Sequence, residues 1–243
     1  MESSNPAFNP KTLARLRAEG ALETTSHMSL NGTINKVGIL VTLTVASSLW
    51  GWSMADSEIG PTLAMGSIFL NLILAFVIIY NKSKAPVLAP VYAVVEGLAL
   101  GFIANMADRS SQGVALQAFI GTFGILFAMV GAYRLGLLRA TETFRRVMSL
   151  AMMGIMLTYF VDIALMFFGM RVPMVHEGTP FGIIFSLVVI GVASLNFILD
   201  FDMIERAVKE RAPKWMEWYA GFAVLLTIIW LYLEILRLLN KRR

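Results

Sequence analysis

The chain has 243 residues, of which 57% are hydrophobic and 15% charged, and its formal net charge is +4. Soluble domains are about 45 to 50% apolar and about 25% charged, so this composition excludes an ordinary water-soluble domain. Cysteine is absent, which excludes disulfides and thiolate metal sites. The Lys and Arg residues are clustered between apolar stretches, and we interpret them as topology signals rather than as a surface for nucleic acid.

The N-terminal stretch is polar and begins with a turn-rich segment over residues 5–10. It lacks the apolar core of about 7 to 15 residues that a signal peptide needs. We therefore predict that residues 1–33 form a flexible cytoplasmic segment, followed by a transmembrane domain over residues 34–240.

Seven apolar stretches follow, each close to the roughly 20 residues that a helix needs to cross a 30 Å hydrocarbon layer. The runs are continuous rather than alternating, and backbone groups in lipid must be hydrogen-bonded internally, which favours helices over a barrel. The expected fold is therefore an all-α, polytopic membrane bundle of about seven transmembrane helices. The predicted spans are residues 34–55, 59–80, 86–105, 114–133, 147–169, 180–201 and 218–237.

Basic residues alternate between the two sides of the predicted spans. Four precede or begin the first span, and the connections after the second, fourth and sixth spans carry two, four and four, whereas the other connections carry at most one. By the positive-inside rule, the N-terminus is cytoplasmic. Seven crossings would place the basic tail Lys241, Arg242 and Arg243 outside. Either this tail is an exception to the rule, or a segment near the end is re-entrant and the C-terminus is inside.

The ionisable residues within the spans are acids. Each costs at least about 2.5 to 3.5 kcal/mol near the bilayer centre and is therefore a functional-site hypothesis by default. Asp200 and Asp202 lie near the predicted cytoplasmic face, Glu96 near the middle, and Asp162 and Glu234 towards the far face. Carboxylate oxygens suit Ca²⁺ or protons better than soft metals, and protons compete with cations for carboxylates that are removed from water. We expect a pH-sensitive cation path, with Ca²⁺ as a transient occupant and no resident cofactor.

Structural roles are alternatives for two of these acids. Asp202 can end a helix in the headgroup region at little cost, and we weigh this equally with a functional role. Glu234 is followed at i+3 by Arg237, and we slightly favour a structural ion pair there.

Structural roles are also open for two more of these acids, Asp162 and Glu96. Asp162 can be a single buried acid bonded to a neighbour. Glu96 precedes Gly97 and Gly101, whose spacing allows another helix to approach closely, so it can link two helices.

Catalysis is not expected. Both histidines, His27 and His176, lie outside the apolar spans, which excludes a His-rich metal centre and a Ser–His pair within the membrane. The chain has no His-Glu-x-x-His motif, and neither Asp162 nor Asp200 follows Gly-x-Gly, as an intramembrane aspartyl protease would require. The last span also lacks a lysine that could hold retinal.

Two late stretches carry a family likeness: Asn-Phe-Ile-Leu-Asp-Phe-Asp-Met-Ile at 196–204 and Thr-Ile-Ile-Trp-Leu-Tyr-Leu-Glu-Ile-Leu-Arg at 227–237. Together with Tyr-Ala-Val-Val-Glu-Gly-Leu at 92–98, they make the chain resemble the transmembrane Bax-inhibitor-motif family, in a bacterial branch. This resemblance implies a pH-sensitive Ca²⁺ leak path, in which aspartates of the sixth and seventh helices share a proton and form a closing latch.

The resemblance also implies which residues form that latch. The family's sixth-helix aspartate follows an aromatic residue, so Phe201-Asp202 is the better match and Asp200 the second. Thr227, which cannot titrate, stands where the family has its seventh-helix aspartate. We predict an ion path or pH sensor among Asp202, Asp200, Glu96, Thr227, Asp162 and Glu234, with Asp202 and Asp200 as cation ligands.

A non-conducting membrane protein that regulates the stress response or the quality control of membrane proteins is the alternative, with partners that the sequence does not identify. The expected location is the bacterial inner membrane, with a eukaryotic internal membrane as the alternative.

Overall fold

The computed structural model describes residues 27–170 and 172–241. The remaining positions, which include most of the predicted segment 1–33, Arg171 and the tail residues Arg242 and Arg243, lie outside the described residues. Within the described part there is no β-strand, and a single bridge pairs His27 with Pro213. The helices are α2 (Leu30–Met54), α3 (Gly60–Tyr80), α4 (Ala85–Ser110), α5 (Val114–Arg134), α6 (Glu142–Met166), α7 (Pro173–His176), α8 (Pro180–Lys209) and α9 (Met216–Lys241), with a 3₁₀ turn η2 (Lys82–Lys84).

The predicted all-α architecture is confirmed, because seven of these helices are long and apolar enough to cross a membrane. Three of them begin at a polar N-cap: the side chains of Ser29, Thr141 and Thr179 accept hydrogen bonds from backbone amides in the first turns of α2, α6 and α8. These caps place the helix starts in polar sequence. Helix α2 consequently begins at Leu30 rather than at residue 34, and α6 begins at Glu142 rather than at residue 147.

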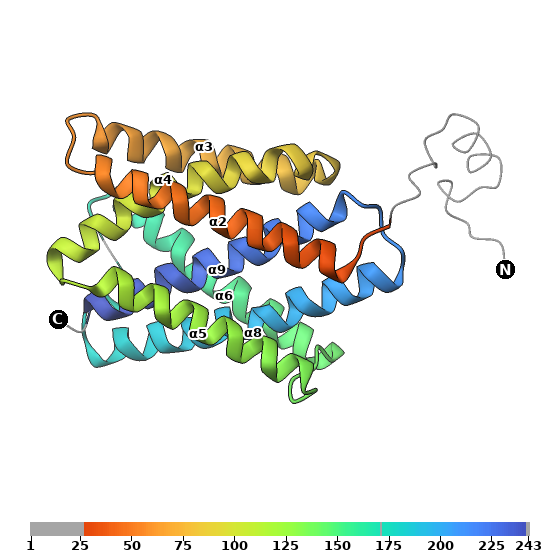
Figure 1. Ribbon diagram of the computed structural model, residues 1–243. Helices are drawn as coiled ribbons and strands as arrows, with labels where there is room; N and C mark the ends of the chain where they lie inside the picture. Colours follow the sequence, from red (N-terminus) through yellow and green to blue (C-terminus); the bar gives the residue numbers. More distant parts are fainter. Residues whose placement is uncertain (1–26, 171, 242–243) are drawn as a thin grey trace.

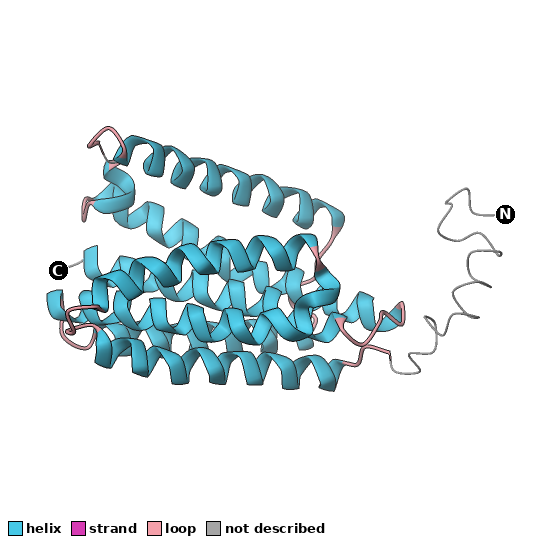
Figure 2. Cartoon of the chain, turned by 90° about the horizontal axis from the view of Figure 1, so that it is seen from above, coloured by secondary structure: helices cyan, strands magenta, loops and turns pink. Residues whose placement is uncertain are grey.

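The seven long helices run side by side along one direction, with α9 in the centre of the bundle (Figures 1 and 2). Helix α9 contacts α2, α4, α5 and α8, whereas α3 packs mainly on α4 and α6 packs on α8. Fully buried side chains such as Phe222, Leu225 and Leu231 line α9 along its length. Because α9 is one continuous helix, no re-entrant segment forms there, and its C-terminal end lies at the opposite end of the bundle from the start of α2.

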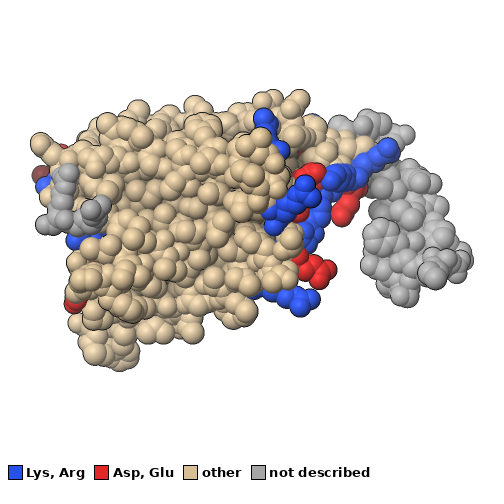
Figure 3. All heavy atoms as spheres, turned by 90° about the horizontal axis from the view of Figure 1, so that it is seen from below, with Lys and Arg blue, Asp and Glu red and all other residues tan. Residues whose placement is uncertain are grey.

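Large apolar side chains are exposed on the outer helices. Phe69 of α3, Phe127 of α5 and Phe160 of α6 are each at least 61% exposed. Figure 3 shows a broad belt without charged residues, bounded by charged groups near the ends of the bundle. Such a belt is stable only in hydrocarbon, and the helices therefore contact the lipid bilayer.

Two contacts fix α2 against its neighbours. At its start, the backbone amide and the hydroxyl of Ser29 donate to Oε1 of the buried Glu217 at 2.9 and 3.0 Å, which ties α2 to the start of α9. Along its middle, α2 packs closely on α4. A Cβ added at Gly97 or Gly101 would collide with the α2 backbone, so the predicted close helix approach at this spacing is present.

Candidate functional site

A buried polar chain links the two last long helices. Thr227 of α9 donates from Oγ1 to Oδ2 of Asp200 on α8 at 2.7 Å, and it accepts a hydrogen bond from Nδ2 of Asn196 at 3.0 Å. Asp200 is 9% exposed and Thr227 is 4% exposed, and the fully buried Phe197 and Ile198 lie on the same helix. Residues 196 and 200 are one helical turn apart, so both side chains face α9.

Asp200 has no cationic partner. Within the described part of the chain, its carboxylate is bonded to Thr227 alone, and no Lys, Arg or His contacts it. An ionised carboxylate that is enclosed without a counter-ion carries a large desolvation cost. The group is therefore stable as a neutral acid, or as an anion once water or a cation has entered.

Asp202 lies in different surroundings, at the predicted cytoplasmic end. Its Oδ2 accepts from Nη2 of Arg145 on α6 at 3.0 Å and also forms an ion pair with Arg206 one turn further along α8. The resemblance favoured Asp202 as the residue facing Thr227, but the structure places Asp200 there. Because residues i and i+2 of a helix do not share a face, Asp200 and Asp202 do not converge on one cation site.

Glu234 is held by a structural ion pair, the alternative that the sequence slightly favoured. Its Oε1 lies 2.8 Å from Nη1 of Arg237 and accepts from the hydroxyl of Tyr159 on α6 at 2.6 Å. Arg237 also donates to the Tyr159 hydroxyl at 2.7 Å, which closes a triangle of contacts. Glu234 is only 2% exposed, so this triangle neutralises a buried charge near the C-terminal end of α9, which is its predicted outer end.

Asp162 is bonded to the segment that follows α6. Its carboxylate accepts from the backbone amide of Val172 at 2.9 Å and lies 2.7 Å from Nε2 of His176 in α7. Asp162 therefore holds this connection against the bundle. The sequence indicated a bonded neighbour for Asp162 but not which one, because His176 lies outside the apolar spans.

Glu96 also lacks a cation. Its Oε2 accepts from Nδ2 of Asn71 on α3 at 2.6 Å, while Oδ1 of Asn71 is buried and has no partner. This contact joins α3 to α4, and Glu96 is also hydrogen-bonded to Tyr92 of α4, which packs on Phe222 of α9. The six predicted site residues are thus dispersed, and the structure brings only Asp200 and Thr227 together.

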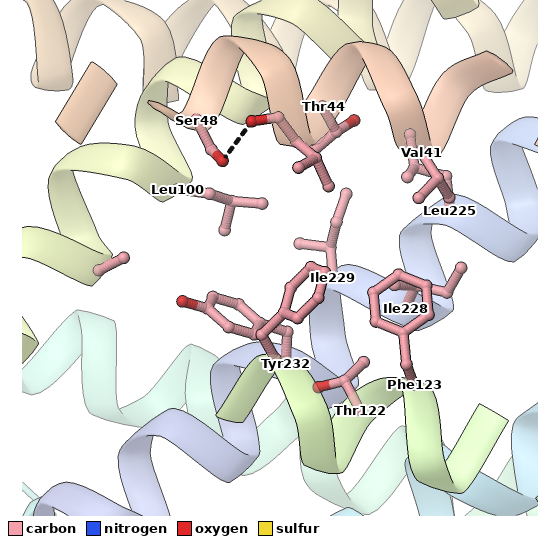
Figure 4. Close-up of a pocket in the computed structure, with 13 residues that line it drawn as sticks. Val41, Thr44, Ser48, Leu100, Thr122, Phe123, Leu225, Ile228, Ile229 and Tyr232 are labelled. Atoms are coloured by element: carbon pink, nitrogen blue, oxygen red, sulfur yellow. Dashed lines mark hydrogen bonds between the residues drawn. The ribbon is translucent and has the colours of Figure 1, made fainter. Parts of the chain in front are cut away.

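Two cavities follow one another along α4 and α9. A central cavity of about 90 Å³ is lined by Leu100, Thr122 and Tyr232, and by Thr44 and Ser48 of α2 (Figure 4). An outer cavity of about 720 Å³ lies nearer the end of α9, with the following residues among its lining: Ile103, Ala107, His176, Leu233, Arg237 and Lys241.

The central cavity reaches the part of α9 that carries Thr227, although neither Asp200 nor Thr227 is among its lining residues. Ile228, next to Thr227 in the sequence, lines the central cavity. Among the described residues, no group of three or more His, Asp or Glu side chains is arranged to hold a metal ion.

Sequence reasoning missed three of the polar partners, namely Asn196, Tyr159 and Asn71. Asn196 offered a signal, because it precedes Asp200 by one helical turn within the stretch that carries the resemblance.

Comparisons with known proteins agree with this architecture. The family model described as Bax inhibitor 1 like matches residues 5–243. Searches of curated proteins and of solved structures found no significant match. A match over nearly the full length, together with seven candidate membrane helices, shows that the chain belongs to the Bax inhibitor 1 like family.

Proposed function

We propose that the protein is a cation leak channel for Ca²⁺. The channel is closed when the Asp200 carboxyl is protonated and remains in contact with Thr227. The single observation that carries this proposal is the buried Asp200 carboxyl, which faces the central helix α9 and has a hydroxyl but no cation beside it. Glu96 also lacks a cation, but its partners Asn71 and Tyr92 lie on α3 and α4 rather than on α9.

The gating step follows from the charge of the carboxyl group. A protonated Asp200 is neutral and can remain packed against Thr227. Loss of the proton leaves an enclosed anion, whose desolvation cost is relieved only when water or a cation enters. Deprotonation therefore opens the contact, and the flux rises with pH.

The surroundings of Asp200 support a cation as the conducted species. The carboxylate of Asp200, the hydroxyl of Thr227 and the amide oxygen of Asn196 are hard oxygen ligands, which Ca²⁺ prefers. The outer and central cavities supply space along α9 towards this contact. A cation that enters from the outer end would reach Asp200 after the central cavity.

The remaining expectations belong to the same proposal. The protein acts without catalysis, resides in the bacterial inner membrane and has its N-terminus in the cytoplasm. The basic residues at the end of the bundle where α2 starts support this orientation.

A second candidate function is a non-conducting membrane protein that regulates stress responses or the quality control of membrane proteins. One observation favours it: Asp162, Asp202 and Glu234 are each bonded to groups of the chain itself, as in a purely structural network. In this case Asp200 would only link α8 to α9.

Ca²⁺ flux into dye-loaded proteoliposomes, measured over a pH series, separates these functions. We expect flux that rises with pH in the wild type, and flux that no longer depends on pH in Asp200→Asn. Asp202→Asn is the matched control, because it changes an aspartate of the same helix that faces Arg145 and Arg206; it should keep the wild-type pH profile.

Absence of flux in the wild type, or an unchanged pH profile in Asp200→Asn, would refute the channel proposal. Flux that appears only in Thr227→Asp would mean that the fold is competent to conduct and that a second carboxyl is needed. The non-conducting regulatory function would then be favoured over the channel.

A further inference from the structure

A groove lies between α2 and α5 at the predicted cytoplasmic end of the bundle, on the opposite side of the central cavity from the outer one. Its volume is about 470 Å³. Its walls are apolar residues of α2 and α5, and its floor is formed by α8 and α9. The apolar lining includes Ile34, Val37, Phe127, Val130, Ile204 and Val224.

The groove opens sideways into the membrane. The wall residues Ile34 and Phe127 are 48% and 68% exposed, whereas Ile204 and Val224 of the floor are 6% and 3% exposed. Along α2 the groove extends from Leu30 to Val37, and seven residues at about 1.5 Å of rise give a depth of about 10 Å. This depth corresponds to the upper part of one leaflet, whose hydrocarbon is about 15 Å thick.

Water is a poor occupant of this groove. A buried water needs several polar partners, but within the groove, below Arg134 at its mouth, the polar groups of the lining are already bonded. Thr33 donates to the Ser29 carbonyl, and the Tyr133 hydroxyl donates to Glu205 at 2.6 Å. A flexible hydrocarbon chain from the bilayer can fill such a space without leaving a polar group unpaired.

The mouth of the groove carries a positive charge that has no ion-pair partner among the described residues. Among the described residues, Arg134 makes no hydrogen bond or ion pair, and it is exposed at the end of α5. The acid at the mouth, Glu205, is neutralised by Lys209 at 2.7 Å. An anionic headgroup would therefore find one uncompensated guanidinium, which can bind a phosphate through two hydrogen bonds.

We propose that this groove binds an anionic phospholipid, with one acyl chain between α2 and α5 and the phosphate on Arg134. The lipid would lie against Val224 and Ile204, which pack within about one helical turn of Thr227 and Asp200. This inference does not depend on ion conduction, because it rests on the shape, the lining and the charge of the groove.

Native mass spectrometry of the full chain in detergent, titrated with palmitoyl-oleoyl phosphatidylglycerol or palmitoyl-oleoyl phosphatidylcholine, tests the proposal. We expect the wild type to retain one phosphatidylglycerol more tightly than phosphatidylcholine. Arg134→Gln should bind phosphatidylglycerol about fivefold more weakly, which corresponds to about 1 kcal/mol for one basic residue near an anionic surface. Arg139→Gln is the control, since Arg139 is exposed in the next loop but does not line the groove.

A second pair of variants tests the acyl-chain site. Ile34→Trp should fill the groove and weaken the retention of both lipids. Ile39→Trp enlarges a residue of the same helix that is similarly exposed, at 43%, but lies outside the groove, and it should leave retention unchanged. Equal retention of the two lipids by the wild type would overturn the proposal, as would equal losses in Arg134→Gln and Arg139→Gln.

Discussion

The contact between α2 and α4 offers a quantitative test of the fold at Gly101. A Cβ at this position would meet the carbonyl oxygen of Ser48, the amide nitrogen of Trp52 and the carbonyl carbon of Gly51. All three are backbone atoms of α2, so no side-chain rotation can relieve the contact. We therefore expect Gly101→Ala to force the two helices apart.

The magnitude follows from a matched control. Overpacking of a close interface costs about 1 to 3 kcal/mol, whereas replacing a helical glycine by alanine gains about 0.5 to 1 kcal/mol. Gly124 lies within α5, and a Cβ there would meet nothing within 4 Å. Gly124→Ala therefore carries the propensity gain alone. The difference in unfolding free energy between the two variants is the steric cost, about 1 to 3 kcal/mol.

The assay is thermal unfolding of the purified protein in detergent, followed by the fluorescence of its five tryptophans. For a chain of this size, 1 kcal/mol shifts the melting temperature by about 2 to 4 °C, so Gly101→Ala should melt roughly 2 to 12 °C below Gly124→Ala. Equal melting temperatures for the two variants would refute the close approach of α2 and α4.

Three further predictions concern the outer end and the topology. Glu234→Gln leaves Arg237 without an anionic partner and should destabilise the protein by about 3 kcal/mol in the same melt, at the low end for a buried pair because Arg237 is 35% exposed. Replacing both residues by Leu should recover most of this loss. Asp162→Asn should accelerate hydrogen exchange in the connection before α7, as measured by mass spectrometry. Because the chain has no native cysteine, Glu177→Cys should react with an impermeant thiol reagent outside intact cells, whereas Arg139→Cys should react only after lysis.

The number of helices could be predicted because the bilayer imposes it. A crossing needs a continuous apolar run of fixed length, and composition alone reveals such runs. Helix ends beyond the hydrocarbon are not constrained in this way. Helix α8 extends to Lys209 rather than ending at residue 201, and its last turns are stabilised by the charged pairs Asp202 with Arg206 and Glu205 with Lys209. Polar sequence of this kind gives no hydrophobic signal.

The partners of the intramembrane acids were harder to predict, because they depend on the rotation of each helix about its axis. A shift of two residues turns a side chain by about 200° around a helix. Asp200 and Asp202 therefore face opposite sides of α8, although only one residue separates them in the sequence. Tyr159 lies 75 positions from Glu234, and neither periodicity nor spacing links the two.

The basic residue at the end of α9 illustrates why charge counting gave conflicting topologies. Lys241 donates from Nζ to the carbonyl oxygens of Met174 and Gly182 at 2.9 and 3.3 Å, and to the hydroxyl of Ser186 at 3.0 Å. A lysine whose three donors are satisfied by the protein serves the packing of α7 and α8 on α9. Such a residue carries little information on which side of the membrane it lies, so a single continuous α9 is compatible with a basic end on the outer side.

The charge of the bonded partner distinguishes Asp200 from Asp202 and Glu234. Asp202 and Glu234 are each bonded to an arginine, so their charge is compensated within the fold. Asp162 is held by the backbone amide of Val172 and by His176. Asp200 and Glu96 are bonded to neutral groups, and of these two Asp200 is the one bonded directly to a residue of the central helix. A buried acid without compensation is costly to keep ionised, and this cost is what can couple its proton to a movement of α8 against α9. Replacing Asp200 therefore tests function, whereas replacing the compensated acids tests stability.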